Sequence, residues 1–192
     1  MRLFTAVLPP EGAIAELSAA ERELRGLPGA ERLRRTDPAG RHITLAFYGE
    51  TDDSLVPGLR DRLAEVALRH APFPLRLTGG GRFSGRVLWA DVEGDREALG
   101  RLAADTRAAG LLAGVPPPVE PPEYRPHLTL AFAKKSDRVP LDPFVAGLAG
   151  FRGSLWRAGQ LALVSSRLPD TAAREAGRSP RYVTEALWPL TG

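Results

Sequence analysis

Short apolar runs alternate with amphipathic stretches along the chain, and their spacing predicts a succession of strands and helices. The apolar runs at 2–8 and 43–48 are too short for helices and indicate buried strands. Residues 11–25 and 53–69 place apolar side chains at helical spacing and predict two amphipathic helices. Residues 73–77 alternate between polar and apolar positions, which predicts a third strand.

The same order of elements begins again at residue 86. Residues 86–92 predict a strand, 96–109 a helix and 127–133 a second strand. The repeat is also visible in the residues, because HITLAF at 42–47 and HLTLAF at 127–132 are identical at five of six positions. We therefore expect two similar lobes related by a pseudo-twofold axis.

The end of the chain predicts two more strands. Residues 160–165 and 182–187 are expected to complete the second lobe, with an exposed flexible loop at 167–181 between them. The glycine-rich segment GGGRFSG at 79–85 lies between two strands and not before a helix, which favours a hairpin turn over a phosphate-binding loop.

Composition excludes several classes of protein. The chain has 192 residues, of which 43% are apolar and 26% charged, as in an ordinary globular domain. No run approaches the roughly 20 apolar residues of a membrane span, and the first apolar run is too short for a signal peptide. We expect a cytoplasmic protein without membrane contact. The absence of cysteine excludes disulfides, a thiolate nucleophile and a Cys-ligated zinc site.

The basic residues are almost all arginine. Lys134 and Lys135 are the only lysines, so 24 of the 26 basic residues are arginine, and the net charge is +3. Arginine suits phosphate because its planar guanidinium donates two parallel hydrogen bonds. A GC-rich genome produces the same bias, so the charge permits a nucleic-acid substrate without demonstrating one.

The repeat carries a chemical constellation. Because side chains alternate along a strand, His42 and Thr44 share one face, as do His127 and Thr129. The pseudo-twofold axis would bring these faces together across a groove, where two imidazoles with pKa values near 6.5 could act as general acid and general base. The third histidine, His70, is expected at a helix C-terminus.

Two simpler interpretations compete with a catalytic pair. A single His-x-Thr on a strand is more often a half-buried polar pair, but its duplication at equivalent points of a repeat favours function. A zinc site usually needs three protein ligands, and no HExxH or carboxylate–histidine cluster accompanies the pair. We expect neither a metal nor another cofactor.

At this point the residues resemble a known family. The motifs at 42–45 and 127–130, the opening RLFTAVLPP, the RVLW strand and the closing RYVTEALWPL resemble the two-histidine (2H) phosphoesterase superfamily. The resemblance is closest to its bacterial RNA 2′,3′-cyclic phosphodiesterase branch, also named 2′-5′ RNA ligase, and spans nearly the whole chain.

This resemblance implies a fold and an activity. The fold is α+β and bilobal, with antiparallel sheets, outer helices and a central cleft, in one domain over residues 1–192. The activity is metal-independent conversion of 2′,3′-cyclic phosphate ends, on RNA or on nucleotides, to 2′-phosphates by a monomer. The catalytic histidines of the family fall on His42 and His127, and its phosphate-binding threonines on Thr44 and Thr129.

The chain departs from the family pattern in two places. Where this branch commonly has an arginine five residues after the second histidine, the chain has Phe132, and Lys134 or Lys135 is expected to supply the charge. The first motif ends in Phe-Tyr-Gly instead of Phe-Leu-Gly, which leaves Phe47 open to base stacking or to the core. Arg125 is a further candidate for a phosphate contact.

We expect His127 to activate water and His42 to protonate the leaving 3′ oxygen, although the repeat suits the reverse assignment nearly as well. Two other functions stay open. The same chemistry in reverse would make the protein a 2′-5′ RNA ligase, which requires a second RNA site. A cleft that has lost turnover would make it a non-catalytic RNA- or nucleotide-binding module.

Overall fold

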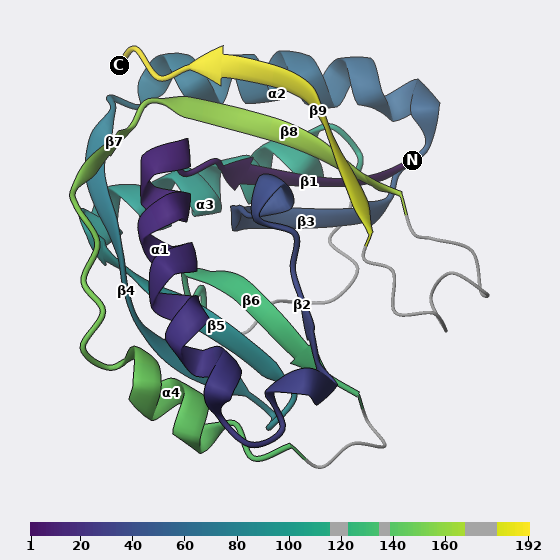
Figure 1. Cartoon of the computed structure of the whole chain (residues 1–192). Coiled ribbons are helices and arrows are strands. Elements are labelled where there is room, and N and C mark those ends of the chain that lie inside the picture. The colour runs from purple at the N-terminus through teal and green to yellow at the C-terminus, as the bar shows by residue number, and fades with distance from the viewer. Residues whose placement is uncertain (116–122, 135–138, 168–179) are drawn as a thin grey trace.

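The computed structural model describes residues 1–115, 123–134, 139–167 and 180–192. An antiparallel sheet with the strand order β7-β4-β5-β6-β3-β1-β8-β9 forms its centre, and the short β2 pairs with β6 (Figure 1). The strands are β1 (Arg2–Val7), β2 (Leu33–Arg35), β3 (Ile43–Glu50), β4 (Phe73–Phe83), β5 (Val87–Gly94), β6 (His127–Ala133), β7 (Trp156–Ala158), β8 (Gln160–Arg167) and β9 (Arg181–Pro189). The helices are α1 (Glu11–Glu23), α2 (Val56–Arg69), α3 (Arg96–Leu112) and α4 (Asp142–Leu148).

The strand order confirms the internal repeat. One unit runs β1-α1-β3-α2-β4 and the other β5-α3-β6-α4-β8. The units meet at the centre of the sheet, where Ile43 of β3 pairs with Leu128 of β6. On one side of this junction β1 follows β3, and on the other side β5 follows β6. The predicted α+β architecture of two related antiparallel halves with outer helices is confirmed.

The outer strands are exchanged between the units, which corrects one expectation. Residues 160–165 and 182–187 do not complete the second lobe, because β8 pairs with β1 and β9 pairs with β8. In return, β4 of the first unit pairs with β5 of the second. The order of elements along the chain could not predict this exchange. Which strands become neighbours depends on the path that each connecting helix takes over the sheet. Most of the predicted loop, residues 168–179, lies outside the described residues.

The helices bury leucine-rich faces against the sheet. Helices α2 and α3 pack on each other, α2 also packs on β8 and β9, and α3 packs on β3, whereas α1 and α4 pack on β4. Leu17, Leu63 and Leu99 are fully buried in one continuous core, and each such side chain contributes about 1.5–3 kcal/mol. No helix of the described chain is both long and apolar enough to cross a membrane.

The glycine-rich segment serves close packing as well as the turn. Strand β4 extends to Phe83, so the glycines at 79–81 lie inside the strand, and the turn of the predicted hairpin follows at Ser84 and Gly85. A Cβ atom at Gly81 would overlap the indole ring of Trp89, so glycine is needed where this ring crosses β4. Elements α4, β2 and β7 were not predicted, because each is too short to show a period.

Candidate active site

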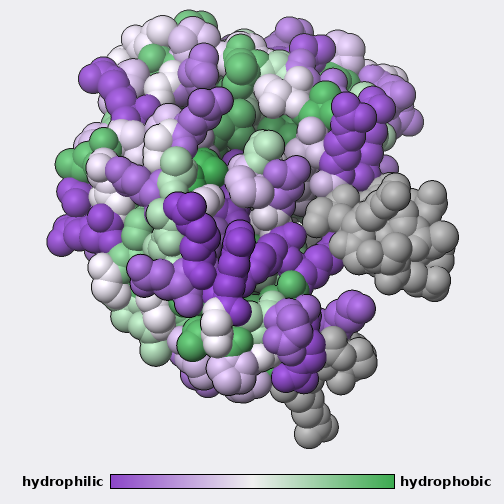
Figure 2. All heavy atoms as spheres, viewed as in Figure 1, coloured by the Kyte–Doolittle hydropathy of each residue, from purple (hydrophilic) through white to green (hydrophobic). Residues whose placement is uncertain are grey.

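The central junction brings the two His-x-Thr motifs together. Around the antiparallel bridge between Ile43 and Leu128, the register places His42 opposite Thr129 and Thr44 opposite His127. The two bridging residues are fully buried in the core, whereas the four polar side chains are half-buried on the opposite side of the strands. We call this second side the open face. Figure 2 shows hydrophilic side chains gathered across the middle of the molecule.

Both imidazoles are oriented by the same backbone contact. Nδ1 of His42 lies 2.8 Å from the carbonyl oxygen of Gly40, and Nδ1 of His127 lies 2.8 Å from that of Arg125. A carbonyl oxygen only accepts hydrogen bonds, so Nδ1 carries the proton in both rings. Nε2 is then the atom of each neutral imidazole that can accept a proton, and of each charged one that can give a proton away.

Each imidazole also packs against two aromatic rings, which contact each other as well. The ring centre of His42 is 4.6 Å from that of Phe4 on β1 and 4.9 Å from that of Tyr182 on β9. The second histidine lies 4.9 Å from Phe83 on β4 and 6.1 Å from Trp89 on β5. Because the outer strands are exchanged, each histidine packs against one ring from its own unit and one from the other.

Burial shifts the protonation of His42. Burial lowers the pKa of His42 below its ordinary value of 6.5, since it disfavours the charged ring. The bond to the carbonyl of Gly40 opposes this effect, and the nearby charge of His127 lowers the pKa further. The imidazole of His42 is therefore neutral over a wider range of pH than a free histidine.

A buried ion pair fixes the chain just before His42. The Arg41 guanidinium lies 2.6 Å from Glu21 of α1, with side chains only 3% and 6% exposed. Arg41 also donates to Oγ1 of Thr36, whose hydroxyl donates to the carbonyl oxygen of Thr129, 2.9 Å away. The network thus ties α1 to both motifs. Sequence reasoning missed it, because nothing in the local pattern shows that this arginine is buried.

Matching bulges determine the orientation of the two phenylalanines that follow the motifs. The pairing of β1 with β3 skips Leu45, and the pairing of β5 with β6 skips Leu130. Each bulge shifts the alternation by one position, so Phe47 and Phe132 turn to the open face. Phe47 is 37% exposed there, which leaves it available for stacking and excludes the core.

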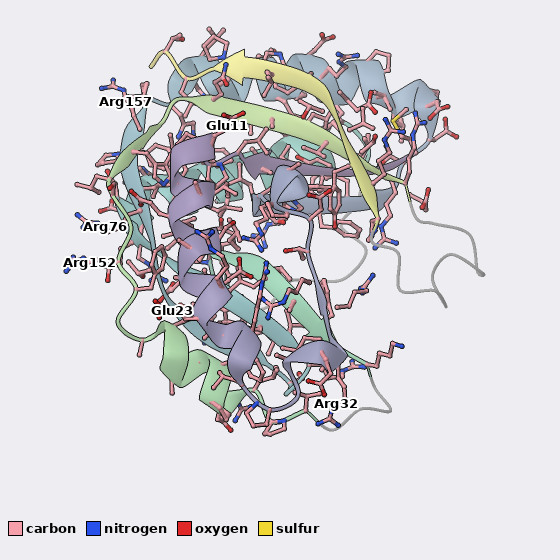
Figure 3. The ribbon with its side chains drawn as sticks, viewed as in Figure 1. Glu11, Glu23, Arg32, Arg76, Arg152 and Arg157 are labelled. Carbon is pink, nitrogen blue, oxygen red and sulfur yellow. The ribbon has the colours of Figure 1, made fainter. Side chains whose placement is uncertain are left out.

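The other predicted residues occupy different surroundings. Arg125 and Lys134 are exposed, and Arg125 serves the site through its carbonyl oxygen, while Lys135 lies outside the described residues. His70 directly follows α2, and its Nε2 lies 2.8 Å from Asp105 of α3, apart from both motifs. The arginines are not all gathered at the site, since those labelled at the β4–β7 edge in Figure 3 point outward.

Two further observations bear on what the site could hold. A cavity of about 750 Å³ lies between α2 and β9, and neither histidine motif lines it. This cavity is therefore separate from the candidate active site. Within the described ranges, no group of three or more His, Cys, Asp or Glu side chains could hold a metal ion.

Comparison with known proteins identifies the family. The sequence profile described as "2'-5' RNA ligase superfamily" matches residues 9–169. The chain belongs to this superfamily. The resemblance predicted from the paired motifs is therefore confirmed.

Known proteins resemble the chain in sequence and in fold. An "RNA 2',3'-cyclic phosphodiesterase" of Thermus thermophilus is 36% identical over 181 residues, which cover 88% of this chain and 83% of that protein. One of Geobacillus stearothermophilus is 30% identical over 79% of the chain, but the match covers only 46% of that relative. A crystal structure of a Thermus thermophilus protein has a TM-score of 0.77 at 30% identity and covers 100% of this chain and 99% of that one.

Proposed function

We propose that the protein hydrolyses 2′,3′-cyclic phosphate ends of RNA or nucleotides to 2′-phosphates, with His42 and His127 as general acid and base. The observation that carries this proposal is the matched pair of imidazoles, each with Nδ1 held by a carbonyl oxygen and Nε2 left for proton transfer. The names of the relatives support the reaction, since two matched proteins are called RNA 2′,3′-cyclic phosphodiesterases.

Two proton transfers accompany the reaction. Nε2 of His127 takes a proton from water as the water oxygen attacks phosphorus in line with the 3′ oxygen. The bond between phosphorus and the 3′ oxygen breaks, and Nε2 of His42 gives its proton to that oxygen, which leaves a 2′-phosphate. The common orientation of the two rings permits the reverse assignment, so the roles need their own test.

The lowered pKa of His42 matters for its role as the acid. A neutral His42 cannot protonate the leaving oxygen, so the ring must gain a proton when substrate binds. The negative charge of the cyclic phosphate next to the ring favours the imidazolium and raises its pKa in the complex. The protein thereby couples protonation of the acid to substrate binding.

The hydroxyls of Thr44 and Thr129 are proposed to donate hydrogen bonds to the nonbridging phosphate oxygens. Each lies opposite the histidine of the other motif, so both reach the space between the two rings. Donors placed beforehand where negative charge develops stabilise the transition state. Phe47 on β3, Arg125 before β6 and Lys134 after β6 are proposed to contact the rest of the substrate.

Turnover of a nucleoside 2′,3′-cyclic phosphate, with and without EDTA, tests this proposal. We expect hydrolysis to the 2′-phosphate at equal rates in both buffers, because the histidines and threonines supply the chemistry. Binding without turnover would instead support a binding module. Loss of activity in EDTA that one divalent metal restores would contradict the two-histidine mechanism.

A further inference from the structure

Each motif is followed by a phenylalanine ring that carries an arginine. The guanidinium carbon of Arg2 lies 4.9 Å from the centre of the Phe47 ring, and that of Arg34 lies 4.9 Å from the centre of the Phe132 ring. Arg34 and Phe132 are direct partners across β2 and β6, so both side chains are on the open face. The cation–aromatic pair is thus repeated on both sides of the site, although the two arginines come from unrelated segments.

Tyr182 links the two pairs to the catalytic centre. The register pairs Leu3, which follows Arg2, with Ser165, and it pairs Ser166 with Tyr182, so Arg2 and Tyr182 lie near the same end of three neighbouring strands. Burial raises the pKa of Tyr182, while the charges of Arg34 and Arg2 both oppose that rise. The ring of Tyr182 also packs 4.9 Å from His42. Two arginines over aromatic rings and a tyrosine that packs on His42 therefore share the open face with the histidines.

These groups suit the backbone of a nucleic acid. A guanidinium held over an aromatic ring can still donate N–H groups in its own plane to two phosphate oxygens. Its plane can also stack on a nucleobase, as arginine does in complexes with single-stranded RNA. A nucleoside 2′,3′-cyclic phosphate has only one phosphate, which the proposed function assigns to the histidines and threonines of the two motifs. A second anion site is useful only for a substrate that carries a second phosphate.

We propose that Arg2, Arg34 and Tyr182 form an anion site for the phosphodiester that precedes the terminal nucleotide, so that the preferred substrate is an RNA chain and not a free cyclic mononucleotide. This inference rests on the proposed function and specifies its substrate. The two phenylalanine rings hold the guanidinium planes in place, which reduces the side-chain entropy lost on binding.

The test compares kcat/KM for two substrates. One is adenosine 2′,3′-cyclic phosphate, and the other is the dinucleotide in which a second adenosine is joined to it through a 3′-5′ phosphodiester. We expect the dinucleotide to be favoured about ten- to a hundredfold, as is typical of a hydrogen-bonded contact to a charged group. Equal efficiency on both substrates would overturn the anion site. A lack of turnover on both would instead refute the proposed function, so the two failures are distinguishable.

Variants assign the preference to particular side chains. Arg34→Gln and Arg2→Gln should each lower the ratio of the two efficiencies severalfold, and the double variant should bring it close to one. Phe132→Leu removes the ring below Arg34 and should lower the ratio less. Arg62→Gln is the matched control, because Arg62 is an exposed arginine on α2 that pairs with Glu65. An unchanged ratio in the double variant would overturn the inference.

Moving the positive charge from Arg34 to a neighbouring position distinguishes loss of the charge from a change in structure. Since Arg34 and Phe132 face the same side of paired strands, Phe132→Arg in the Arg34→Gln background should restore part of the preference. In the wild-type protein, added salt should lower kcat/KM for the dinucleotide more steeply than for the mononucleotide, because one more phosphate is neutralised. Equal salt dependence of the two substrates would contradict the anion site even if the variants failed to fold.

Discussion

The two halves of the site share their design but differ in their surroundings. In both, a carbonyl oxygen orients Nδ1, two aromatic rings pack against the imidazole, and a bulge turns a phenylalanine to the open face. The His42 half lies over a small buried cluster that contains Phe4 and borders the ion pair of Arg41 with Glu21. The repeat thus preserves the geometry of the reacting groups, while the environment of each half has diverged.

This divergence matters because the reaction needs two different protonation states. Two identical imidazoles in identical surroundings would titrate alike, and the form with one neutral and one charged ring would be only part of the population. Burial lowers the pKa of His42, which separates its titration from that of an ordinary histidine. In the free protein this packing favours the neutral form of His42, so the charged form that the proposed acid role needs depends on the bound phosphate.

Removal of either imidazole should have the largest effect on turnover, and it tests whether the two halves contribute equally. His42→Ala and His127→Ala should each reduce turnover by about 10²- to 10⁴-fold, the usual effect of losing a general acid or base. His70→Ala is the control, because His70 contacts Asp105 between two helices. Steady-state kinetics on a cyclic mononucleotide measure the effect. A folded motif variant with nearly wild-type turnover would refute the two-histidine mechanism.

A substrate with sulfur in place of the bridging 3′ oxygen separates the two roles. A thiolate leaves without protonation, since its pKa is near 8.5, so the general acid becomes dispensable. We expect His42→Ala to regain most of its lost rate on this substrate relative to the wild type, whereas His127→Ala stays impaired. The opposite pattern would assign water activation to His42.

Loss of one hydroxyl should have a smaller effect. Thr44→Val and Thr129→Val keep the shape of the side chain but delete a donor to charged phosphate, worth roughly 1.5–3 kcal/mol. That corresponds to a fall of about 10- to 150-fold in kcat/KM with little change in Tm. Thr184→Val, at an exposed position on β9, serves as the control. Variants that unfold readily yet keep their specific activity would show that the threonines are structural.

Two glycines test how the aromatic rings support each half. A Cβ atom at Gly81 would overlap the ring of Trp89, whereas one at Gly40 would lie 2.9 Å from the ring of Tyr182. Gly81→Ala should therefore lower the free energy of unfolding by about 1–3 kcal/mol, and Gly40→Ala by less. Denaturant unfolding measures both, with Gly100→Ala on α3 as the control, because its Cβ would meet open space. Equal losses at Gly81 and Gly40 would contradict this difference in contact.

The smallest effect concerns the pKa of His42. NMR titration of the imidazole should give a pKa below 6.5, and His127→Gln should raise it by removing the nearby charge. Because the folded state binds this proton more weakly than the unfolded chain, the stabilising effect is present above about pH 6.5 and is lost as pH falls toward the lowered value. A pKa for His42 above 6.5 in the wild-type protein would contradict this.

Local pattern predicted much of the fold and the centre of the site. The bounds of β6 agree with the prediction at both ends, and β1, β3, α1 and α2 agree closely, because each carries a clear period or apolar run. The alternation of a strand also sufficed to group His42 with Thr44. The residues around them were missed, since Arg2, Arg34 and Arg41 reach the site through strand pairing and burial that no local pattern reveals.

The sequence by itself determined the repeat, the two His-x-Thr motifs and the division of each strand into an apolar and a polar face, because these depend only on chain order and side-chain period. The tertiary structure decided the rest. It exchanged β4 and β8 between the units, which placed an aromatic ring from each unit against the histidine of the other. It also turned Phe47 and Phe132 to the open face, since a bulge arises from the register between two strands and neither strand alone specifies it.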